Sequence, residues 1–225
     1  MTEARARLFV FAKGPRLGAG KTRLAAKLGT VEALRINRFL QSRGLRAAQD
    51  PRWETLLMVS PRAALDGVFP NVWPPPSSLA RALQGRDGLG ERLALVFARW
   101  GPTAVIGVDC PEISAAAIQE GWRALRRARF SIGPATDGGF WFFAARRGWD
   151  AVEALRGPVR WSTPYAATDL LANLPAAAAR VRTLADVDDR DDWRAFLGRV
   201  RRQNRSPLLA DAPLFQFRAR RAQDY

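Results

Sequence analysis

A glycine-rich segment from Lys13 to Arg23 combines residue types that bind phosphate. It contains three glycines, and it lies between an apolar run and a stretch with helical character. Glycines let the backbone approach a phosphate, and the N-terminus of a helix favours an anion. The end of the segment, Gly20-Lys21-Thr22, matches the end of a P-loop, but the P-loop spacing requires glycine where Pro15 stands. The segment is therefore either a different phosphate cradle or an ordinary glycine-rich turn.

Asp109 is the first candidate metal ligand, because it directly follows the apolar run 104–108. In open α/β sheets, ligands bind outside the carboxyl ends of the strands. A carboxylate at such an end is well placed to hold a hard cation. The alternative is that Asp109 caps a helix or stabilises a turn, since Pro111 fixes the chain just beyond it.

Residues 186–192 carry five carboxylates in seven positions, which is conspicuous in a basic chain. Acidic residues at the start of a helix suit its dipole, so part of this run is expected to cap the last helix. A carboxylate near the strand end, Asp186 or Asp188, could meet Asp109 across the sheet and share a metal with it. Two protein oxygens, with phosphate and water completing the shell, are a common Mg²⁺ arrangement.

The absence of histidine narrows the possible chemistry. The chain has no His and one cysteine, Cys110. Ser-His-Asp and Cys-His catalysis are therefore excluded, and a structural zinc site is not credible. A metal would have to rest on carboxylates, carbonyls and water, which favours Mg²⁺ or Mn²⁺. Acid–base chemistry would depend on Asp, Glu, Lys or Tyr.

Two further segments have side chains suited to a nucleotide or its partner. Gln84 and Gly85 open a glycine-spaced loop, and the Gln84 amide offers both a donor and an acceptor to a base edge. Trp161 could stack on a ring, and Ser162 and Thr163 could cap the helix that follows. Alone, each pattern is equally typical of a surface loop or of the core.

The net charge of +15 leaves three kinds of partner open. They are nucleic acid, an anionic membrane surface and phosphorylated substrates. The arginines are scattered through the chain, so the charge can also reflect the composition of an arginine- and alanine-rich proteome rather than a binding site. No apolar run is long enough to span a membrane, and the polar N-terminus lacks the apolar core of a secretory signal. We therefore expect a cytoplasmic protein without a membrane span.

Alternating apolar runs and helical stretches predict an α/β fold. Expected strands cover residues 8–12, 55–59, part of 68–78, 104–108, 130–133, 140–145 and 180–187. Expected helices cover 21–28, 31–49, 91–100, 114–129, 164–174 and 190–202, with Ser114 as an N-cap. This order predicts a three-layer αβα domain with a mostly parallel sheet. The tight turn at Asp137-Gly138-Gly139 could insert one antiparallel strand. The domain would span residues 1–202, followed by an arginine-rich tail over 203–225.

In their order along the chain, these segments resemble one family. It is the GT-A-like nucleotide-diphospho-sugar transferase superfamily, of CofC/MobA-like type, and within it a bacterial branch labelled arsenosugar-biosynthesis-type glycosyltransferase. The matching motifs lie at residues 11–24 (F-A-K-x-P…K-T-R-L), 84–93 (Q…L-G-E-R), 107–113 (G-T-D-C-P-E-L), 133–140 (G-P-A-x-D-G-G), 161–163 (W-S-T) and 186–193 (D-V-D). The sequence departs from the pattern at Val108, where Thr is usual, and at Asp189-Arg190, where Thr-Pro is usual.

The resemblance implies a role for each motif. The GT-A fold would place the metal on Asp109, with Asp188 as its second ligand, although the departure at Asp189-Arg190 leaves Asp186 as an alternative. Lys21 and Asp109 would be the catalytic residues. The nucleotide would contact Ala12, Lys13, Gly14, Lys21, Arg23, Gln84 and Gly85. The sugar or acceptor would lie against Asp137, Gly138, Gly139, Trp161, Ser162 and Thr163.

These roles predict a transferase that depends on Mg²⁺ or Mn²⁺ and uses a nucleotide-linked donor and a small-molecule acceptor. The resemblance favours glycosyl transfer from a nucleoside diphosphate sugar over nucleotidyl transfer that releases pyrophosphate. A rival interpretation is a non-catalytic protein that binds a nucleotide or a polyanion such as RNA. The charge favours this rival, whereas the lack of a basic-plus-aromatic RNA motif counts against it.

Overall fold

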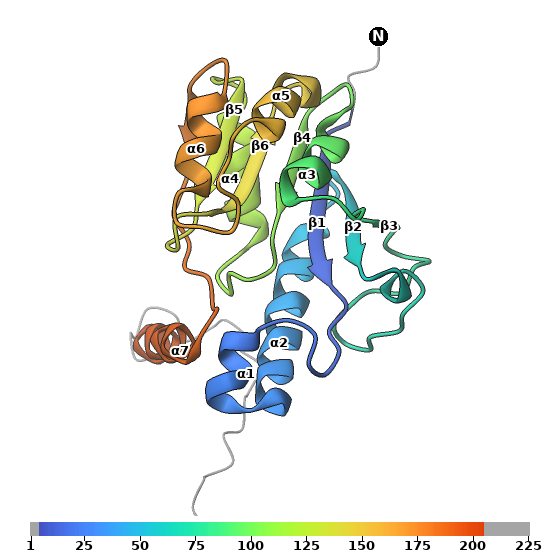
Figure 1. Ribbon diagram of the computed structural model, residues 1–225, viewed down its shortest axis with the longest axis vertical. Coiled ribbons are helices and arrows are strands. Elements are labelled where there is room, and N and C mark those ends of the chain that lie inside the picture. The colour runs from blue at the N-terminus through green and yellow to red at the C-terminus, as the bar shows by residue number, and fades with distance from the viewer. Residues whose placement is uncertain (1–4, 205–225) are drawn as a thin grey trace, which may run out of the picture.

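The computed structural model describes residues 5–204 of the 225-residue chain, and a seven-stranded sheet organises them (Figure 1). Across the sheet the strands are β3 (Arg81–Leu83), β2 (Glu54–Ser60), β1 (Arg7–Lys13), β4 (Thr103–Ile106), β6 (Phe140–Ala145), β5 (Phe130–Pro134) and β7 (Ala178–Arg180). Neighbours are parallel, except that β6 runs antiparallel to both β4 and β5. The predicted mostly parallel sheet with one antiparallel strand is thus confirmed.

Seven α-helices are described between residues 5 and 204. They are α1 (Thr22–Leu28), α2 (Thr30–Ala48), α3 (Leu89–Phe97), α4 (Ala115–Ala124), α5 (Val152–Arg156), α6 (Ala166–Asn173) and α7 (Arg190–Asn204), and η1 (Arg62–Ala64) and η2 (Gly148–Ala151) are short 3₁₀ turns. Among the residues described, no helix is both long and apolar enough to cross a bilayer.

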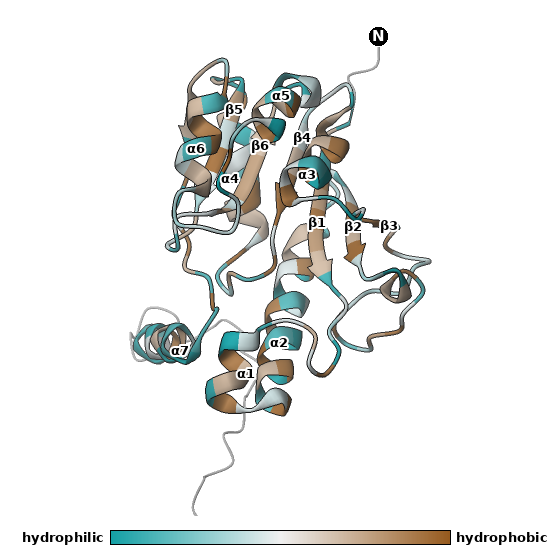
Figure 2. Ribbon diagram, in the orientation of Figure 1, coloured by the Kyte–Doolittle hydropathy of each residue, from teal (hydrophilic) through white to brown (hydrophobic). Residues whose placement is uncertain are grey.

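The sheet is covered on both faces because its side chains alternate. In β1, Val10 packs with residues of α2 and α4, whereas Phe9 packs with residues of α3, α5 and α6 on the other face. The same alternation separates Phe142 from Phe143 in β6. Figure 2 shows hydrophobic residues concentrated in the central strands, while α7 is largely hydrophilic. The predicted three-layer αβα architecture is confirmed.

A third apolar cluster lies below the sheet and joins α1, α2 and α7 (Figure 1). Leu24, Ile36, Leu40 and Phe196 are buried there, together with Val187 from the segment that precedes α7. This small core fixes both α1 and residue 187 near the carboxyl end of β1. It therefore positions two segments that are more than 160 residues apart.

Three expected elements are wrong in place or extent. No strand forms within 68–78, because this segment contains Pro70 and Pro74–Pro76, which cannot donate to a sheet; the strand lies at Arg81–Leu83 instead. The strand expected at 180–187 occupies Ala178–Arg180, with one further bridge between Ala135 and Leu184.

The third difference is the helix after Ser114, which ends at Ala124 rather than near Arg129. Its start is as predicted, because the Ser114 side chain accepts a hydrogen bond from Ala117 N. The short helix α5 was not predicted. At the C-terminus, α7 continues to Asn204, and the rest of the expected tail, residues 205–225, lies outside the described part of the chain.

Candidate active site

The loop after β1 combines a tight start with an open middle. Gly14 N donates to Ser60 O at 2.8 Å, and a Cβ at Gly14 would lie 3.0 Å from Ala64 Cβ. Gly18 and Gly20 have φ of 74° and 86°, yet no atom lies within 4 Å of where their Cβ atoms would be. Glycine at these two positions is therefore needed for the positive φ rather than for close packing, and the space beside the loop is open.

Lys21 ends this loop in a left-handed conformation, with φ of 50°. A left-handed residue that is not glycine costs about 1–2 kcal/mol, and such residues cluster at functional sites. The Lys21 side chain is only 7% exposed, and its Nζ lies 2.6 Å from Asp109 Oδ1 and 2.8 Å from Asp188 Oδ1. The ammonium also donates to Val187 O at 2.6 Å. Three predicted site residues from distant motifs therefore meet at one ammonium group.

The two carboxylates control the charge of Lys21. Burial alone would lower the pKa of this lysine, but the attraction and the hydrogen bonds of Asp109 and Asp188 outweigh it and raise the pKa above 10.5. A raised pKa in the folded state means that the ion pairs stabilise the fold fully at neutral pH, and that this contribution is lost only as the pH rises through the folded value. Lys21 is thus a fixed cation at physiological pH.

The segment 186–188 reaches this lysine because Val187 anchors it. Val187 is fully buried among α1, α2 and α7, and its N–H donates to Asp109 O at 3.1 Å. With the middle residue turned inward, the acidic residues on either side of it remain partly accessible to solvent. The Asp-Val-Asp order therefore presents two carboxylates to the site while holding the chain against Asp109.

Asp188 also belongs to a second group of carboxylates. Ligand oxygens of Asp137, Asp186 and Asp188 all lie within 4.8 Å of one another, and only this combination of three acidic groups, among the residues described, meets that condition. Burial and the nearby Asp137 carboxylate raise the pKa of Asp186. Such a concentration of negative oxygen suits a hard divalent cation. Asp188 thus lies between the lysine pair and the acidic group.

Two further acidic residues of the 186–192 run, Asp189 and Asp192, cap the start of α7. Asp192 accepts hydrogen bonds from the backbone N–H groups of Asp188 and Asp189, and Asp189 accepts from those of Asp191 and Asp192. The backbone hydrogen bonds from Asp192 and Asp191 lower the pKa of Asp189, and nearby Arg23 lowers it further. Part of the run thus caps the last helix, as expected, while the site role of Asp186 and Asp188 stays a prediction.

The Asp137-Gly138-Gly139 turn connects the acidic group to the loop 161–164. Asp137 accepts a hydrogen bond from Gly139 N at 2.8 Å, which closes the turn. Gly138 has φ of 88°, and a Cβ there would lie 2.0 Å from Pro164 O. Gly138 O also accepts from Ala167 N at 3.1 Å at the start of α6. The two segments predicted to face the sugar or acceptor are therefore in direct contact.

Within the loop, Trp161 packs into the core while its neighbours face solvent. The Trp161 ring meets Phe140 edge-on at 6.4 Å and closely approaches Gly90, where a Cβ would lie 2.7 Å from the indole nitrogen. Ser162 and Thr163 are exposed, and Ser162 has φ of 61°. Trp161 therefore has a packing role. Its contact with the sugar or acceptor stays a prediction and would need the part of the ring that Phe140 and Gly90 leave uncovered.

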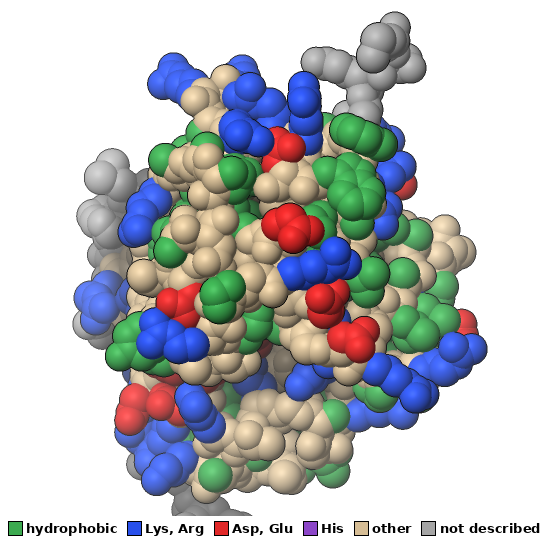
Figure 3. Space-filling view, turned by 45° about the horizontal axis from the view of Figure 1, so that its top comes forward, with side chains coloured by type: hydrophobic (Ala, Val, Ile, Leu, Met, Phe, Trp, Pro, Cys, Tyr) green, Lys and Arg blue, Asp and Glu red, His purple; other side chains and the backbone are tan. Residues whose placement is uncertain are grey.

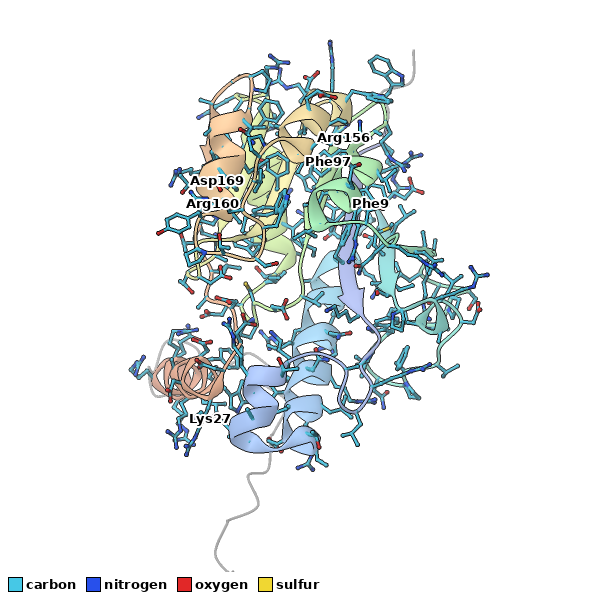
Figure 4. The ribbon with its side chains drawn as sticks, viewed as in Figure 1. Phe9, Lys27, Phe97, Arg156, Arg160 and Asp169 are labelled. Atoms are coloured by element: carbon cyan, nitrogen blue, oxygen red, sulfur yellow. The ribbon has the colours of Figure 1, made fainter. Side chains whose placement is uncertain are left out.

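An ion pair fixes the beginning of this loop. Arg160 donates to both carboxylate oxygens of Asp169 on α6 at 2.8 Å, and its guanidinium lies 4.0 Å from the centre of the Tyr165 ring. Arg160 and Asp169 are labelled next to each other in Figure 4. The hydrogen bonds from the Arg160 side chain and backbone lower the pKa of Asp169 to about 2. The loop therefore keeps this anchor at neutral and mildly acidic pH.

Gln84 is buried, and its amide nitrogen is already engaged. Its Nε2 donates to Ala12 O at 3.0 Å and to Met58 O at 2.8 Å, so it bridges β1 and β2. Gly85 follows with φ of 88°. The Gln84 nitrogen therefore serves the sheet, and a contact between this residue and a base, which remains a prediction, would depend on its oxygen.

Replacing Gln84 with alanine tests which role dominates. We expect a loss of about 1–3 kcal/mol in unfolding free energy, because two backbone carbonyls lose their buried donor. Urea denaturation measures this loss, and nucleotide affinity measured on the folded variant measures the base contact. An unchanged stability with a weakened preference for one base would contradict the structural role.

The other predicted nucleotide contacts surround the loop. Lys13 and Arg23 are exposed, and Ala12 is buried at the end of β1. A cavity of about 330 Å³ lies between the loop and helices α1 and α2, and its lining includes Arg16, Gly18, Gly20 and Asn37. The bond from Lys21 to the backbone carbonyl of Val187 was not predicted, and Asp186, predicted as an alternative ligand beside Asp109, was not expected to meet Asp137. Only the Asp-Val-Asp spacing hinted at them.

Comparison with solved structures identifies the fold as that of nucleotide-diphospho-sugar transferases. A protein from Desulfovibrio desulfuricans G20, provisionally assigned as such a transferase, matches with a TM-score of 0.75 at 20% identity, covering 92% of this chain and 91% of that one. The 2-C-methyl-D-erythritol 4-phosphate cytidylyltransferase from Thermus thermophilus matches at a TM-score of 0.51 and 15% identity, over 88% of this chain and all of that one (100%).

The sequence itself defines the family. Residues 43–163, more than half of the chain, match the family described as uncharacterized protein conserved in bacteria (DUF2064). The chain therefore belongs to this family. Among curated proteins, none matches the sequence.

Proposed function

We propose that this protein is a metal-dependent transferase that uses a nucleotide-linked donor, most simply a nucleoside diphosphate sugar. The observation that carries the proposal is the buried ammonium of Lys21 between Asp109 and Asp188, at the end of a glycine-rich loop that leaves its backbone accessible. A cation fixed beside an open loop suits a diphosphate.

Lys21 would act on the leaving group. A preorganised cation stabilises negative charge as it develops, and it does so most strongly where water is excluded. In glycosyl transfer, an acceptor hydroxyl forms a bond to the anomeric carbon and gives up its proton to solvent, while the bond from that carbon to the diphosphate oxygen breaks. The diphosphate leaves with the electron pair, next to the lysine. Lys13 and Arg23 would add positive charge at the exposed ends of the loop.

The acidic residues fit a divalent cation, Mg²⁺ or Mn²⁺. Such an ion, when bound, would neutralise diphosphate charge. Asp188 is common to both candidate ligand sets, one with Asp109 and one with Asp137 and Asp186. In the first set, Lys21 now bonds to both carboxylates, so an ion there would have to share them with the ammonium. In the second set, whose ligand oxygens lie within 4.8 Å of one another, only Asp188 also bonds to Lys21, so an ion there would share one carboxylate with the ammonium rather than two.

Thermal unfolding with a panel of nucleotides and nucleotide sugars, with and without Mg²⁺ or Mn²⁺, tests the proposal. A ligand at about 100 times its Kd should add roughly 2.7 kcal/mol to stability. We expect stabilisation that needs the metal, and we expect it to vanish in Asp188→Asn. Comparing Asp109→Asn with Asp137→Asn then separates the two ligand sets. If no nucleotide stabilises the protein, or if Asp188→Asn responds like the wild type, the metal–nucleotide site is refuted.

Nucleotidyl transfer is the second candidate, and the similarity of the fold to cytidylyltransferases supports it. The two reactions release different products from the same kind of site. A glycosyltransferase releases a nucleoside diphosphate, whereas a nucleotidyltransferase acting on a nucleoside triphosphate releases pyrophosphate. Product analysis with the donor that gives the largest stabilisation chooses between them.

A further inference from the structure

The end of the sheet at which the parallel strands begin, opposite the candidate active site, carries a strongly basic surface. Strand pairing places the beginnings of β1, β2, β4 and β5 and the end of β6 at this end. Backbone hydrogen bonds link the adjoining turns, from Arg7 N to Pro102 O, from Arg146 N to Arg129 O and from Gly148 N to Gly101 O. We call this surface the basic pole; it consists of residues 5–7, 50–54, 99–102, 126–129 and 146–150.

Arginine dominates the basic pole. Its five segments contain nine arginines and three carboxylates, a net charge of +6. Each carboxylate already pairs with an arginine, Glu54 with Arg7, Asp50 with Arg52 and Asp150 with Arg129. Arg126, Arg127 and Arg147 are exposed and form no ion pair with any described residue. Figure 3 turns this end forward and shows basic side chains gathered along its upper part.

Two tryptophans protrude from the same surface. Trp100 is 78% exposed and Trp149 is 47% exposed. They flank the hydrogen bond between Gly148 N and Gly101 O, so both project from the same pair of turns. Neither contributes to the cores of the fold. Exposed indoles beside unpaired guanidinium groups are an unusual combination on a surface that faces only water.

From this combination we infer that the basic pole docks on an anionic lipid surface. Tryptophan favours the boundary between headgroups and acyl chains, where its indole is partly buried and partly hydrogen-bonded. Arginines nearby are attracted to anionic headgroups, and each adds to the affinity. The indoles belong to protruding turns, where they can enter a headgroup layer. Docking in this way leaves the glycine-rich loop and Lys21, at the other end of the strands, turned toward the aqueous phase.

Flotation of the full chain with phospholipid vesicles tests the inference. We expect binding to vesicles of phosphatidylcholine with phosphatidylglycerol, little binding to phosphatidylcholine alone, and weakening by salt. The variant R126E/R127E/R147E should bind about a hundredfold more weakly. The variant W100A/W149A should bind about tenfold more weakly at unchanged net charge.

Two matched variants serve as controls. R62E/R201E/R202E makes the same change in charge at exposed arginines outside the pole and should keep more of the binding than the pole variant. Val68→Ala removes an exposed apolar side chain elsewhere and should bind like the wild type. All variants keep the C-terminal residues, so basic residues there cannot explain a difference.

Three outcomes would overturn the inference. One is a lack of binding to anionic vesicles, and another is equal loss in the pole variant and its charge-matched control. The third is a salt-sensitive gel shift with an RNA or DNA oligonucleotide that R126E/R127E/R147E abolishes while vesicle binding is unaffected, which would assign the pole to nucleic acid. Nucleotide-dependent stabilisation of the same variants is a separate measurement, so failure here leaves the proposed transferase site untouched.

Discussion

Replacing Lys21 with methionine should abolish most of the stabilisation that a nucleoside diphosphate gives to this protein. It should also slow donor turnover about 10²–10³-fold, which is the usual loss when one preorganised stabilising group is removed. Methionine keeps much of the length and the apolar stem of lysine but removes the charge. Asp109 and Asp188 would then face an incoming diphosphate without the cation that now lies between them. Ligand-dependent thermal shifts and single-turnover rates measure the two effects.

Lys27→Met is the matched control, because it makes the same substitution on the neighbouring helix. Lys27 lies in the last turn of α1, is exposed and forms no ion pair with a described residue (Figure 4). Its variant should respond to nucleotides like the wild type. Equal losses in the two variants would mean that general positive charge, rather than the ammonium held by Asp109 and Asp188, attracts the ligand.

The sheet could be predicted from the sequence because its strands are short apolar runs that lie between turn-forming residues such as glycine and proline. Residues 8–12 and 140–145 lie within strands, and the Asp137-Gly138-Gly139 turn does reverse the chain. The sequence also predicted that Asp109 lies at the carboxyl end of the sheet, because this residue directly follows a buried strand. Local pattern suffices wherever burial and position along one strand decide the outcome.

The meeting of Lys21 with Asp188 required more than local pattern. It depends on residues 185–189 leaving the sheet after the bridge between Ala135 and Leu184, and on Val187 entering a small core made by α1, α2 and α7. The run 180–187 has the apolar alternation of a strand, so the sequence alone favours a continuous strand there. The family resemblance predicted Asp188 beside Asp109, but it did not predict the contact between Asp188 and Lys21.

Side-chain roles were harder to predict where a polar residue is buried. Gln84 has the composition of a surface loop around it, yet its amide joins Ala12 O to Met58 O. Asp137 was expected on the acceptor side, and the structure adds it to the carboxylates of Asp186 and Asp188. A buried amide and a shared carboxylate depend on which strands become neighbours, and a single sequence does not record that.

Gly138→Ala should destabilise the protein by about 2–5 kcal/mol, the sum of a left-handed backbone penalty and the cost of overpacking. The new Cβ would lie 2.0 Å from Pro164 O and 2.6 Å from Pro164 C and Cα, all backbone atoms that no side-chain rotation can move away. Relief would require the loop 161–164 to separate from the Asp137-Gly138-Gly139 turn. Urea denaturation measures the loss in unfolding free energy.

Gly18→Ala separates the two causes, because Gly18 has a similar φ of 74° but open space around its Cβ position. That variant should lose only the backbone contribution, about 1–2 kcal/mol. A larger loss for Gly138→Ala than for Gly18→Ala would therefore isolate the contact with Pro164. Equal losses in unfolding free energy would show that the turn and the loop 161–164 can move apart at little energetic cost. The acceptor side of the site would then be adaptable, whereas a large difference means that the position of Asp137 depends on the loop 161–164 staying in place.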